Sequence, residues 1–334
     1  MKEKRENNPR RRKIMKDKTN GRAFPFLSVI VPAYNSQHSI EECLQSLINQ
    51  NYPKDRYEII VVNDGSTDRT PDILQKYNRS KLIRVIHHDK NRGLAAARNT
   101  GIKNSNGDIL VFIDSDMIAD KNFLLYSESS LSRAGTYGVV GKRLPHPSLP
   151  MDKYQKYRYF SKIGAEKLKD PKKPIPLKYF ILGISAVKKE VIREVGFFDE
   201  SIQKWGGEDN ELACRIFKVH PQGQFYCPKM TALHKHYRPF KDELNNIYDF
   251  SRYNLPILAE KHSEIIDIYY LKFAFCNRNN PFLYKLLGKL ISTTFIREIG
   301  LFLYDILPFP LSNAAIKLLI ANRLLKGYCD EVQK

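Results

Sequence analysis

The sequence predicts an α/β protein: a mostly parallel sheet with helices on both faces, followed by a helical extension at the C-terminal end. Short apolar runs alternate with helix-type segments from Leu27 to Ile113, which is the pattern of β-α-β units. From Asn245 onward the pattern is helical. With 334 residues, 42% of them hydrophobic, the chain is long enough to bury a large core.

Each element of the alternating region has its own local signal. Four buried strands are expected at the apolar runs 27–31, 57–62, 83–86 and 108–113. A helix is expected from Ser39 to about Asn49, because Ser39 and Glu42 have the spacing of a capping box. A second helix begins at Thr70, with Pro71 at its first position, and an alanine-rich third helix covers 94–103.

The pattern becomes irregular after Gly141. Residues 142–178 contain six prolines and several aromatic residues, which favours a loop or lid. A strand at 180–187, a helix at 188–195, a helix from about Glu208 and an extended stretch at 224–227 follow. We therefore expect a disordered basic arm at 1–23, an α/β nucleotide-binding half at 24–143, a second half of the same domain at 144–244, and a helical extension at 245–334.

The net charge of the chain is strongly positive. Its 55 lysines and arginines against 36 acidic residues give +19, a charge that attracts polyanions such as acidic lipid headgroups and phosphorylated substrates. Residues 1–22 supply +7 of this, from ten basic and three acidic residues. The rest is spread without the dense stripe of a nucleic-acid groove, so no nucleic acid is expected as a partner.

Several features point to a cytoplasmic protein. The five cysteines are scattered and odd in number, which excludes a disulfide scaffold and favours a reducing compartment. No apolar core of a signal peptide follows the early arginines. Charged residues interrupt the most apolar stretch, 283–311, so no spanning helix is expected.

Apolar residues in that stretch recur near helical spacing: Leu283, Leu287, Leu290, Phe295, Ile299 and Phe302. Two interpretations stay open. The stripe packs in a core or against a second copy of the chain, or it lies on a membrane surface, which would make the protein peripheral at the inner face.

Polar clusters follow three of the expected strands. Pro32-Ala33-Tyr34-Asn35 ends the first, 63–68 (Asn-Asp-Gly-Ser-Thr-Asp) ends the second, and Asp114-Ser115-Asp116 ends the fourth. Ligands of open α/β sheets bind outside the carboxyl ends of strands. Two carboxylates in a D-x-D motif suit Mg²⁺ or Mn²⁺ held together with substrate phosphates. The sequence lacks G-x-G-x-x-G after the first strand and the P-loop motif, which disfavours dehydrogenases and P-loop nucleotidases.

These motifs, taken in order, resemble the signatures of family-two glycosyltransferases with the GT-A fold. The matching segments are 28–35, 63–68, 91–99 and 114–116. Trp205-Gly206-Gly207-Glu208-Asp209 is similar to the acceptor-side motif of β-1,4-galactosyltransferases and bacterial chondroitin-type polymerases. The resemblance covers about residues 26–240.

The resemblance implies a site on the donor side. The base of a nucleotide sugar would be held by the loop after the first strand, and Asp64 would hydrogen-bond a uracil ring nitrogen. Asp114 would touch the ribose or the water shell of the metal, and Asp116 would ligate it. The residues assigned to nucleotide-sugar binding are Pro32, Ala33, Tyr34, Asn35, Asp64, Gly93, Arg98, Asp114 and Ser115.

On the acceptor side, the resemblance implies that Asp209 is the general base and that Glu208 hydrogen-bonds the acceptor. Trp205, Gly206 and Gly207 would form the sugar-binding turn. In metal-dependent relatives a histidine beyond this motif completes the coordination. His234 is our choice, and His236, two residues on, is a rival because both face one side of an extended segment.

The expected function is a metal-dependent, inverting transfer of a sugar from a UDP-sugar of the Gal, GalNAc, Glc or GlcNAc type. The acceptor would be a hydroxyl of a glycan or lipid-linked acceptor, as in bacterial surface polysaccharide synthesis. One alternative is transfer to a peptide or a small molecule. A second is a nucleotidyltransferase, an enzyme that requires a glycine-rich phosphate loop. A third is a binding protein with a degenerate site. The motifs do not identify the donor sugar, the acceptor or the linkage.

Overall fold

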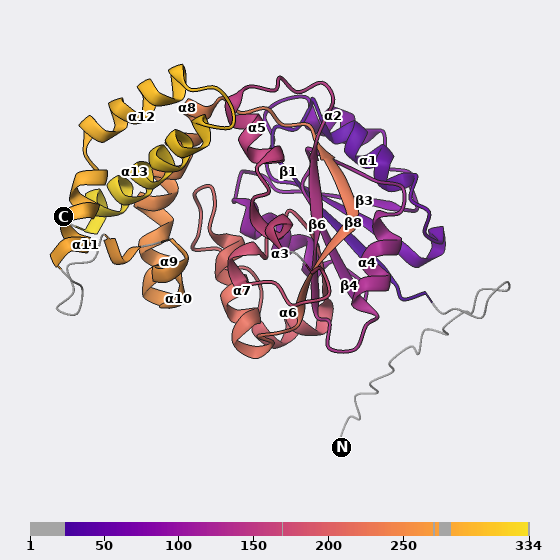
Figure 1. Cartoon of the computed structure of the whole chain (residues 1–334). Coiled ribbons are helices and arrows are strands. Elements are labelled where there is room, and N and C mark those ends of the chain that lie inside the picture. Colours follow the sequence, from indigo (N-terminus) through magenta and orange to yellow (C-terminus); the bar gives the residue numbers. More distant parts are fainter. Residues whose placement is uncertain (1–23, 169, 270, 274–281, 333–334) are drawn as a thin grey trace.

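The computed structural model describes residues 24–168, 170–269, 271–273 and 282–332. The predicted basic arm lies outside these residues. Figure 1 shows a sheet with helices packed beside it and a group of C-terminal helices next to it. The predicted fold class, a mostly parallel sheet with helices on both faces and a helical extension, is confirmed, and the sheet is a mixed one.

Within the described residues, eight strands form one sheet in the order β3-β2-β1-β4-β7-β6-β8-β5. Pairing is parallel from β3 to β4 and between β6 and β8, and antiparallel at β4–β7, β7–β6 and β8–β5. The strands are β1 (Leu27–Ala33), β2 (Tyr57–Asn63), β3 (Ile83–His87), β4 (Ile109–Ile113), β5 (Met117–Ala119), β6 (Gly138–Pro145), β7 (Ile184–Lys188) and β8 (Gln224–His234).

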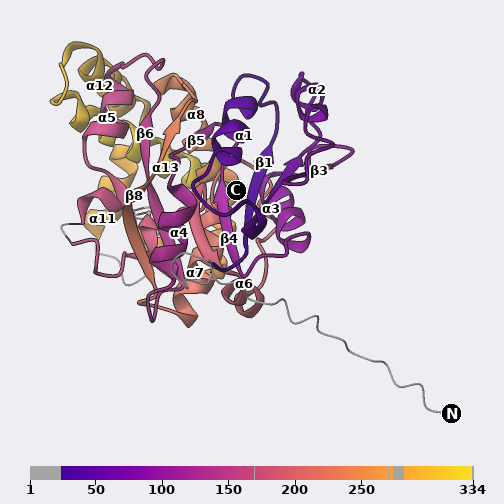
Figure 2. The same cartoon turned by 90° about the vertical axis from the view of Figure 1, so that its right-hand side faces the viewer.

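The helices fall into two groups. Those that pack with the sheet are α1 (Ile40–Ile48), α2 (Thr70–Gln75), α3 (Leu94–Lys103), α4 (Phe123–Leu131), α5 (Lys153–Phe160), α6 (Lys189–Val195) and α7 (Glu208–Val219). The C-terminal helices are α8 (Phe240–Asp249), α9 (Leu255–Lys261), α10 (Glu264–Ile268), α11 (Phe282–Ile291), α12 (Thr294–Ile306) and α13 (Ser312–Val332). Figure 2 shows the second group on the side of β6 and β8, away from β3.

The central strands are buried on both faces, because alternate side chains enter two different cores. Val29 and Val111 belong to a cluster with α1, α2 and α4. Their neighbours Ile30 and Phe112 belong to a cluster with α3, α6 and α7. This sandwiching explains why the first strands read as continuous apolar runs. It also fixes the polar loops at the carboxyl ends of β1, β2 and β4 along one edge.

The C-terminal helices have cores of their own. One cluster joins α8, α13 and Tyr154 of α5, with α12 packed against it. A second joins α7 to α9, α10 and α13, so the extension supports the helix that begins at Glu208. None of the described helices is long and apolar enough to cross a membrane.

The structure differs from the sequence-based prediction in several places. Residues 142–178 are not all loop, because β6 continues through Gly141 to Pro145 and α5 follows. The short strand β5 and helix α4 were not expected at all, and β8 is longer than predicted. The boundaries at 143 and 244 fall inside β6 and α8. Helix α1 begins as expected, but the side chain of Ser39 makes no capping hydrogen bond.

Candidate active site

The loop after β2 is tied to the start of α3 through Asp64. This side chain is buried, and its Oδ1 lies 2.6 Å from His88 Nδ1. Oδ1 also accepts a hydrogen bond from the backbone N–H of Arg92 (3.0 Å), and Oδ2 accepts from the backbone N–H of Gly93 (2.9 Å). Asp64 therefore organises the loop that carries α3, besides any contact that it makes with a base.

The loop after β1 is cross-linked to the loop after β2. Asn35, which has a positive φ of 48°, accepts at Oδ1 from the backbone N–H of Thr67 (2.9 Å). Pro32 and Ala33 complete the buried strand β1, whereas the side chains of Tyr34 and Asn35 are exposed. Of the four residues predicted to hold the base, these two are therefore open to a ligand.

A buried arginine brings the donor-side and acceptor-side carboxylates together. Arg98 of α3 is 1% exposed. Its Nη2 donates to Asp114 Oδ1 (3.1 Å), and its Nη1 donates to Glu208 Oε1 (3.1 Å) and Asp209 Oδ1 (2.5 Å). The second oxygen of Asp209 accepts from the backbone N–H of Leu182 (3.0 Å). We call Arg98, Asp114, Glu208 and Asp209 the Arg98 cluster.

The Arg98 cluster shifts the proton affinity of two of its acids. Burial raises the pKa of Glu208 to about 7; the charge of Asp209 adds to this, and Arg98 opposes it. Burial also raises the pKa of Asp114 to about 6, again opposed by Arg98. Desolvation disfavours the ionised form of a carboxyl group. Glu208 is thus partly protonated at neutral pH and can donate as well as accept a hydrogen bond.

Asp114 is approached closely by the chain before β7. A Cβ added at Gly183 would lie 2.2 Å from Asp114 Oδ2, so only glycine fits beside this carboxylate. Ser115, the middle residue of the D-x-D motif, has its Oγ 2.7 Å from Ser36 Oγ in the loop after β1. The motif is therefore held from both sides.

The end of β8 places two histidines near Asp116. Antiparallel pairing of β5 with β8 sets Met117 opposite His234, and His234 Nε2 lies 3.3 Å from Asp116 Oδ2. The other ring nitrogen of His234, Nδ1, lies 2.7 Å from the hydroxyl of Tyr159 on α5. Asp116 Oδ1 and His236 Nε2 are buried and have no hydrogen-bond partner among the residues that the structure describes.

The electrostatics of this second group favour an ionised Asp116 and a neutral His234. Burial raises the pKa of Asp116, but the hydrogen bond and charge of His234 and the charge of Arg143 outweigh it and bring the pKa to about 2. Burial lowers the pKa of His234 to about 4. We call Asp116, Arg143, His234 and His236 the Asp116 cluster.

The Asp116 cluster fits a divalent cation with few protein ligands. A carboxylate oxygen and an imidazole nitrogen without partners are the donors that such an ion takes. Among the described residues, no group of three or more His, Cys, Asp and Glu side chains is arranged to hold a metal ion.

The turn before α7 exposes the only tryptophan of the chain. Trp205 is 48% exposed, and the guanidinium carbon of Arg238 lies 5.3 Å from the centre of its ring. Gly206 and Gly207 have φ values of 86° and 100°, which side chains rarely allow. Asn254 Nδ2 donates to the carbonyl oxygen of Gly206 (2.7 Å), so the C-terminal helices hold this turn in place.

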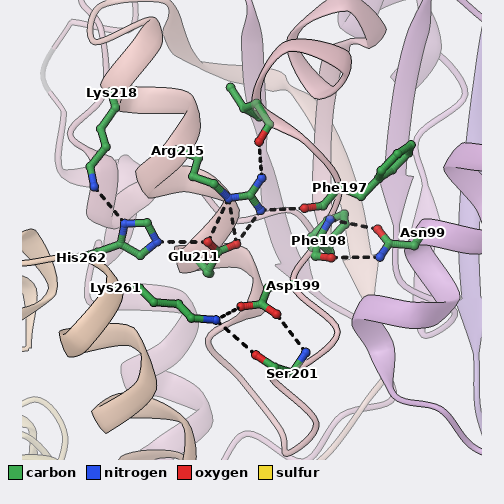
Figure 3. A network of polar contacts seen from close by, with 11 residues as sticks. Asn99, Phe197, Phe198, Asp199, Ser201, Glu211, Arg215, Lys218, Lys261 and His262 are labelled. Atoms are coloured by element: carbon green, nitrogen blue, oxygen red, sulfur yellow. Dashed lines mark hydrogen bonds and ion pairs between the residues drawn. The ribbon is translucent and has the colours of Figure 1, made fainter.

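A polar network also holds α7 in place (Figure 3). Glu211 is buried and lies 3.0 Å from His262 Nε2 at the end of α9. Arg215 donates to Glu211 and to the carbonyl oxygen of Phe197. Asn99, next to Arg98 on α3, bonds the backbone of the same 197–198 segment. The first turn of α7, with Glu208 and Asp209, is thus anchored to both α3 and α9.

Sequence reasoning missed three residues of this region. Gly183 and Arg143 stand in no recognised motif, and their roles depend on chain segments far away in the sequence. Tyr159 is one of the aromatic residues of 142–178, the region predicted to be a loop or lid. Its aromatic neighbours were the signal, but only the packing of α5 against β8 shows that its hydroxyl contacts His234.

The fold and these clusters define an α/β protein whose polar side chains converge outside the carboxyl ends of its strands. The family model described as "Glycosyl transferase family 2" matches residues 28–196, about half of the chain. A second model, "N-terminal domain of galactosyltransferase", matches residues 164–240. The chain belongs to glycosyl transferase family 2, as the resemblance indicated.

Relatives and solved structures agree with this. Glycosyltransferase AglE of Haloferax volcanii is 30% identical over 187 residues, which cover 55% of this chain and 59% of the relative; the match thus spans less than two thirds of that relative. Mannosyltransferase PcManGT from Pyrobaculum calidifontis, solved with GDP-Man and Mn²⁺, has a TM-score of 0.61 at 18% identity, covering 94% of this chain and 89% of its own. S. aureus TarS 1–349 with UDP has a TM-score of 0.52 at 20% identity, with 90% of each chain covered. These structures establish the GT-A fold.

Proposed function

We propose that the protein transfers a sugar from a UDP-sugar of the Gal, GalNAc, Glc or GlcNAc type to a hydroxyl of a glycan or lipid-linked acceptor, with inversion and with a divalent metal. Residues 24–143 would supply the donor side and 144–244 the acceptor side. The observation that carries this proposal is the Arg98 cluster, in which one buried arginine joins Asp114 of the donor side to Glu208 and Asp209 of the acceptor side. This convergence is what transfer between two substrates requires.

Asp209 is proposed as the general base. An acceptor hydroxyl has a pKa far above neutrality, so a carboxylate must take its proton as the new bond forms. The contacts with Arg98 and the Leu182 N–H orient this carboxylate. Glu208, with its pKa raised to about 7 by burial, would donate or accept a hydrogen bond at another hydroxyl of the acceptor.

Asp116 is proposed as a ligand of Mn²⁺ or Mg²⁺, with His234 or His236. The unpartnered Asp116 Oδ1 supports the role of the acid. Both ring nitrogens of His234 have neighbours, while His236 Nε2 has none, so the two histidines remain alternatives. When bound, the ion would supply positive charge to the diphosphate leaving group. The mannosyltransferase of the same fold was solved with Mn²⁺.

A peripheral position at the inner face of a membrane is proposed for the C-terminal helices. Phe295, Ile299, Phe302 and Ile306 line one exposed side of α12, with Phe295 70% exposed. Leu286 and other exposed residues of α11 add to this surface. An amphipathic helix of this kind inserts its apolar side at a bilayer surface, and the net charge of +19 favours an anionic one. The alternative is that this apolar surface packs against a second copy of the chain.

A panel of nucleotide sugars tests the proposed reaction. The protein is incubated with UDP-Glc, UDP-GlcNAc, UDP-Gal, UDP-GalNAc and GDP-Man, each with Mn²⁺ or with EDTA, and nucleoside diphosphate release is measured. We expect release from at least one UDP-sugar with Mn²⁺ and its loss in EDTA. If GDP is released from GDP-Man and no UDP is released from any UDP-sugar, the donor is a GDP-sugar and not the proposed UDP-sugar. If no nucleoside diphosphate is released from any of the five, the proposal is contradicted.

A further inference from the structure

Arg143 lies in β6, beside the strand end that carries His234. Parallel pairing of β6 with β8 sets Arg143 opposite Ala232 and Pro145 opposite His234. The Nε of Arg143 is buried and has no hydrogen-bond partner. Within the described part of the chain its guanidinium forms neither an ion pair nor a side-chain hydrogen bond. It is therefore a cation without an assigned partner at the edge of the candidate active site.

The charge of Arg143 influences the pKa values of several groups at this edge of the sheet. For Asp114, Asp116, Tyr159 and His234, burial is the largest influence on the pKa, and the charge of Arg143 is a further one in each case. These four groups belong to the D-x-D motif, α5 and the end of β8, and the pairing of β6 with β8 places Arg143 beside the last of these.

Arg98 and Arg143 differ in how many of their guanidinium N–H groups already have a partner. The Nη1 and Nη2 groups of Arg98 are occupied by three carboxylates, whereas the guanidinium of Arg143 has no carboxylate partner among the described residues. The Nε of each arginine is buried without a hydrogen-bond partner there, so the two differ at their Nη groups, and an incoming anion would find those of Arg143 without a carboxylate. A planar guanidinium with several N–H groups matches the oxygens of a phosphate better than a lysine does.

We propose that Arg143 binds the diphosphate of the nucleotide-sugar donor and stabilises the charge that develops on it during transfer. This inference rests on the proposed function. In that reaction the bond between the anomeric carbon and the diphosphate oxygen breaks, and its electron pair leaves with that oxygen. The acceptor oxygen forms the new bond and its proton passes to Asp209. Arg143 contacts the departing nucleoside diphosphate, where extra negative charge appears.

The test compares the affinity of UDP and GDP for the wild type, Arg143→Gln, Arg143→Lys and Lys142→Gln. Lys142 is a matched control, because it is the adjacent residue of β6 and its ammonium lies 3.7 Å from Glu166. Trp205, the only tryptophan, provides a fluorescence signal, and calorimetry provides a second measurement. The melting temperature of each variant without ligand checks that it folds.

We expect Arg143→Gln to weaken UDP binding by roughly 10–100-fold, as for a lost charge-assisted hydrogen bond. Arg143→Lys should recover part of the loss, and Lys142→Gln should stay within about twofold of the wild type. The loss should persist in EDTA, because the guanidinium contacts the phosphate directly, and binding of uridine should not change.

Equal UDP affinity in the wild type and Arg143→Gln would overturn this inference and leave the proposed function in place. A loss seen with Mn²⁺ but not in EDTA would also overturn it, because Arg143 would then act through the metal ligands. A wild-type protein that binds neither UDP nor GDP would overturn the proposed function together with the inference.

Discussion

The Arg98 cluster and the Asp116 cluster lie at the same edge of the sheet, but their polar atoms are satisfied to different degrees. In the first, one guanidinium bonds three carboxylates. In the second, three atoms (Asp116 Oδ1, Arg143 Nε and His236 Nε2) are buried without a hydrogen-bond partner among the described residues, whereas in the first only Arg98 Nε is. Buried polar groups are nearly always hydrogen-bonded. We therefore interpret the first cluster as a frame and propose that a ligand completes the second.

This difference assigns separate tasks to the two arginines. Arg98 cannot turn to a ligand without leaving the buried Glu208 and the partly exposed Asp114 and Asp209 without their counter-ion. In this structure the guanidinium of Arg98 contacts carboxylates, and its predicted role in donor binding stays a prediction. Arg143, which no motif singled out, is the cation that we propose to contact a phosphate.

The largest expected effect is at the Asp116 cluster. Asp116→Ala should reduce sugar transfer to the background level and abolish Mn²⁺-dependent UDP binding, because the diphosphate loses the cation that joins it to the protein. Transfer and binding are measured with Mn²⁺ and with EDTA. Full activity of this variant in EDTA would contradict a metal-dependent role for the cluster.

In the Arg98 cluster, Asp209→Asn should lower kcat by roughly 10²–10⁴-fold, because the amide cannot take the proton of the acceptor. The amide oxygen still accepts a hydrogen bond from Arg98, so UDP affinity should change little. Steady-state kinetics and UDP titration separate the two quantities. A collapse of donor affinity would make Asp209 a donor-binding or structural residue.

The two arginines should differ in their effect on stability. Arg98→Met should lower the free energy of unfolding by about 3–5 kcal/mol, since it leaves the buried Glu208 and two partly exposed carboxylates without their counter-ion. Arg143→Met, which breaks no ion pair, should change it by less than about 1 kcal/mol. Urea denaturation measures both. If both variants lose a similar free energy of unfolding, Arg98 and Arg143 do not differ as a structural residue and a ligand-binding residue.

Glu208 should contribute to the pH dependence of the free energy of unfolding. Its pKa in the folded protein is raised from 4.5 to about 7 by burial, so the folded state binds more protons than the unfolded state between these values. The free energy of unfolding then falls as pH rises through this range, by up to about 1.4 kcal/mol per pH unit. In Glu208→Gln this contribution disappears, and urea denaturation at pH 5, 6 and 7 compares the slopes. An identical slope in both proteins would show that Glu208 is not protonated there.

The smallest effect concerns the C-terminal helices. Phe295 and Phe302 are exposed. The double variant Phe295→Ser/Phe302→Ser should sediment less with anionic phosphatidylglycerol vesicles than the wild type, and its free energy of unfolding should be nearly unchanged. Binding should weaken as salt rises, and deletion of residues 1–22 should weaken it further. Equal binding to neutral and anionic vesicles, or none to either, would remove the proposed membrane role. A concentration-dependent dimer lost in the same variant would indicate a second copy instead.

The parallel part of the fold could be predicted because each β-α-β unit carries local signals. The helix 94–103 agrees with α3 residue for residue, and β1 to β4 agree to within two residues at each end. The second half could not be read in the same way. Gly141 looks like the end of regular structure, but a Cβ there would lie 2.3 Å from the carbonyl oxygen of Met230. The glycine is required by the close approach of β8, which is a long-range contact.

The same division applies to the site. Asp116 and Asp209 were predicted because they stand in motifs that resemble those of a family. The contact between Arg98 and Glu208 joins residues 110 positions apart, and Tyr159, the partner of His234 on α5, is 75 positions from it. Such pairs are set by the packing of α3, α5, α7 and β8. The sequence predicts which residues are candidates, and the fold decides which are satisfied and which remain open.

The central claim, that the Asp116 cluster is completed by a nucleotide diphosphate and a divalent cation, is tested most directly by the melting temperature of the wild type and Asp116→Ala. A ligand that binds only the folded state must raise the melting temperature. We expect UDP with Mn²⁺ to raise that of the wild type by more than either alone, and to leave that of Asp116→Ala unchanged. No rise in the wild type with UDP or GDP, in the presence of Mn²⁺ or Mg²⁺, would contradict the claim.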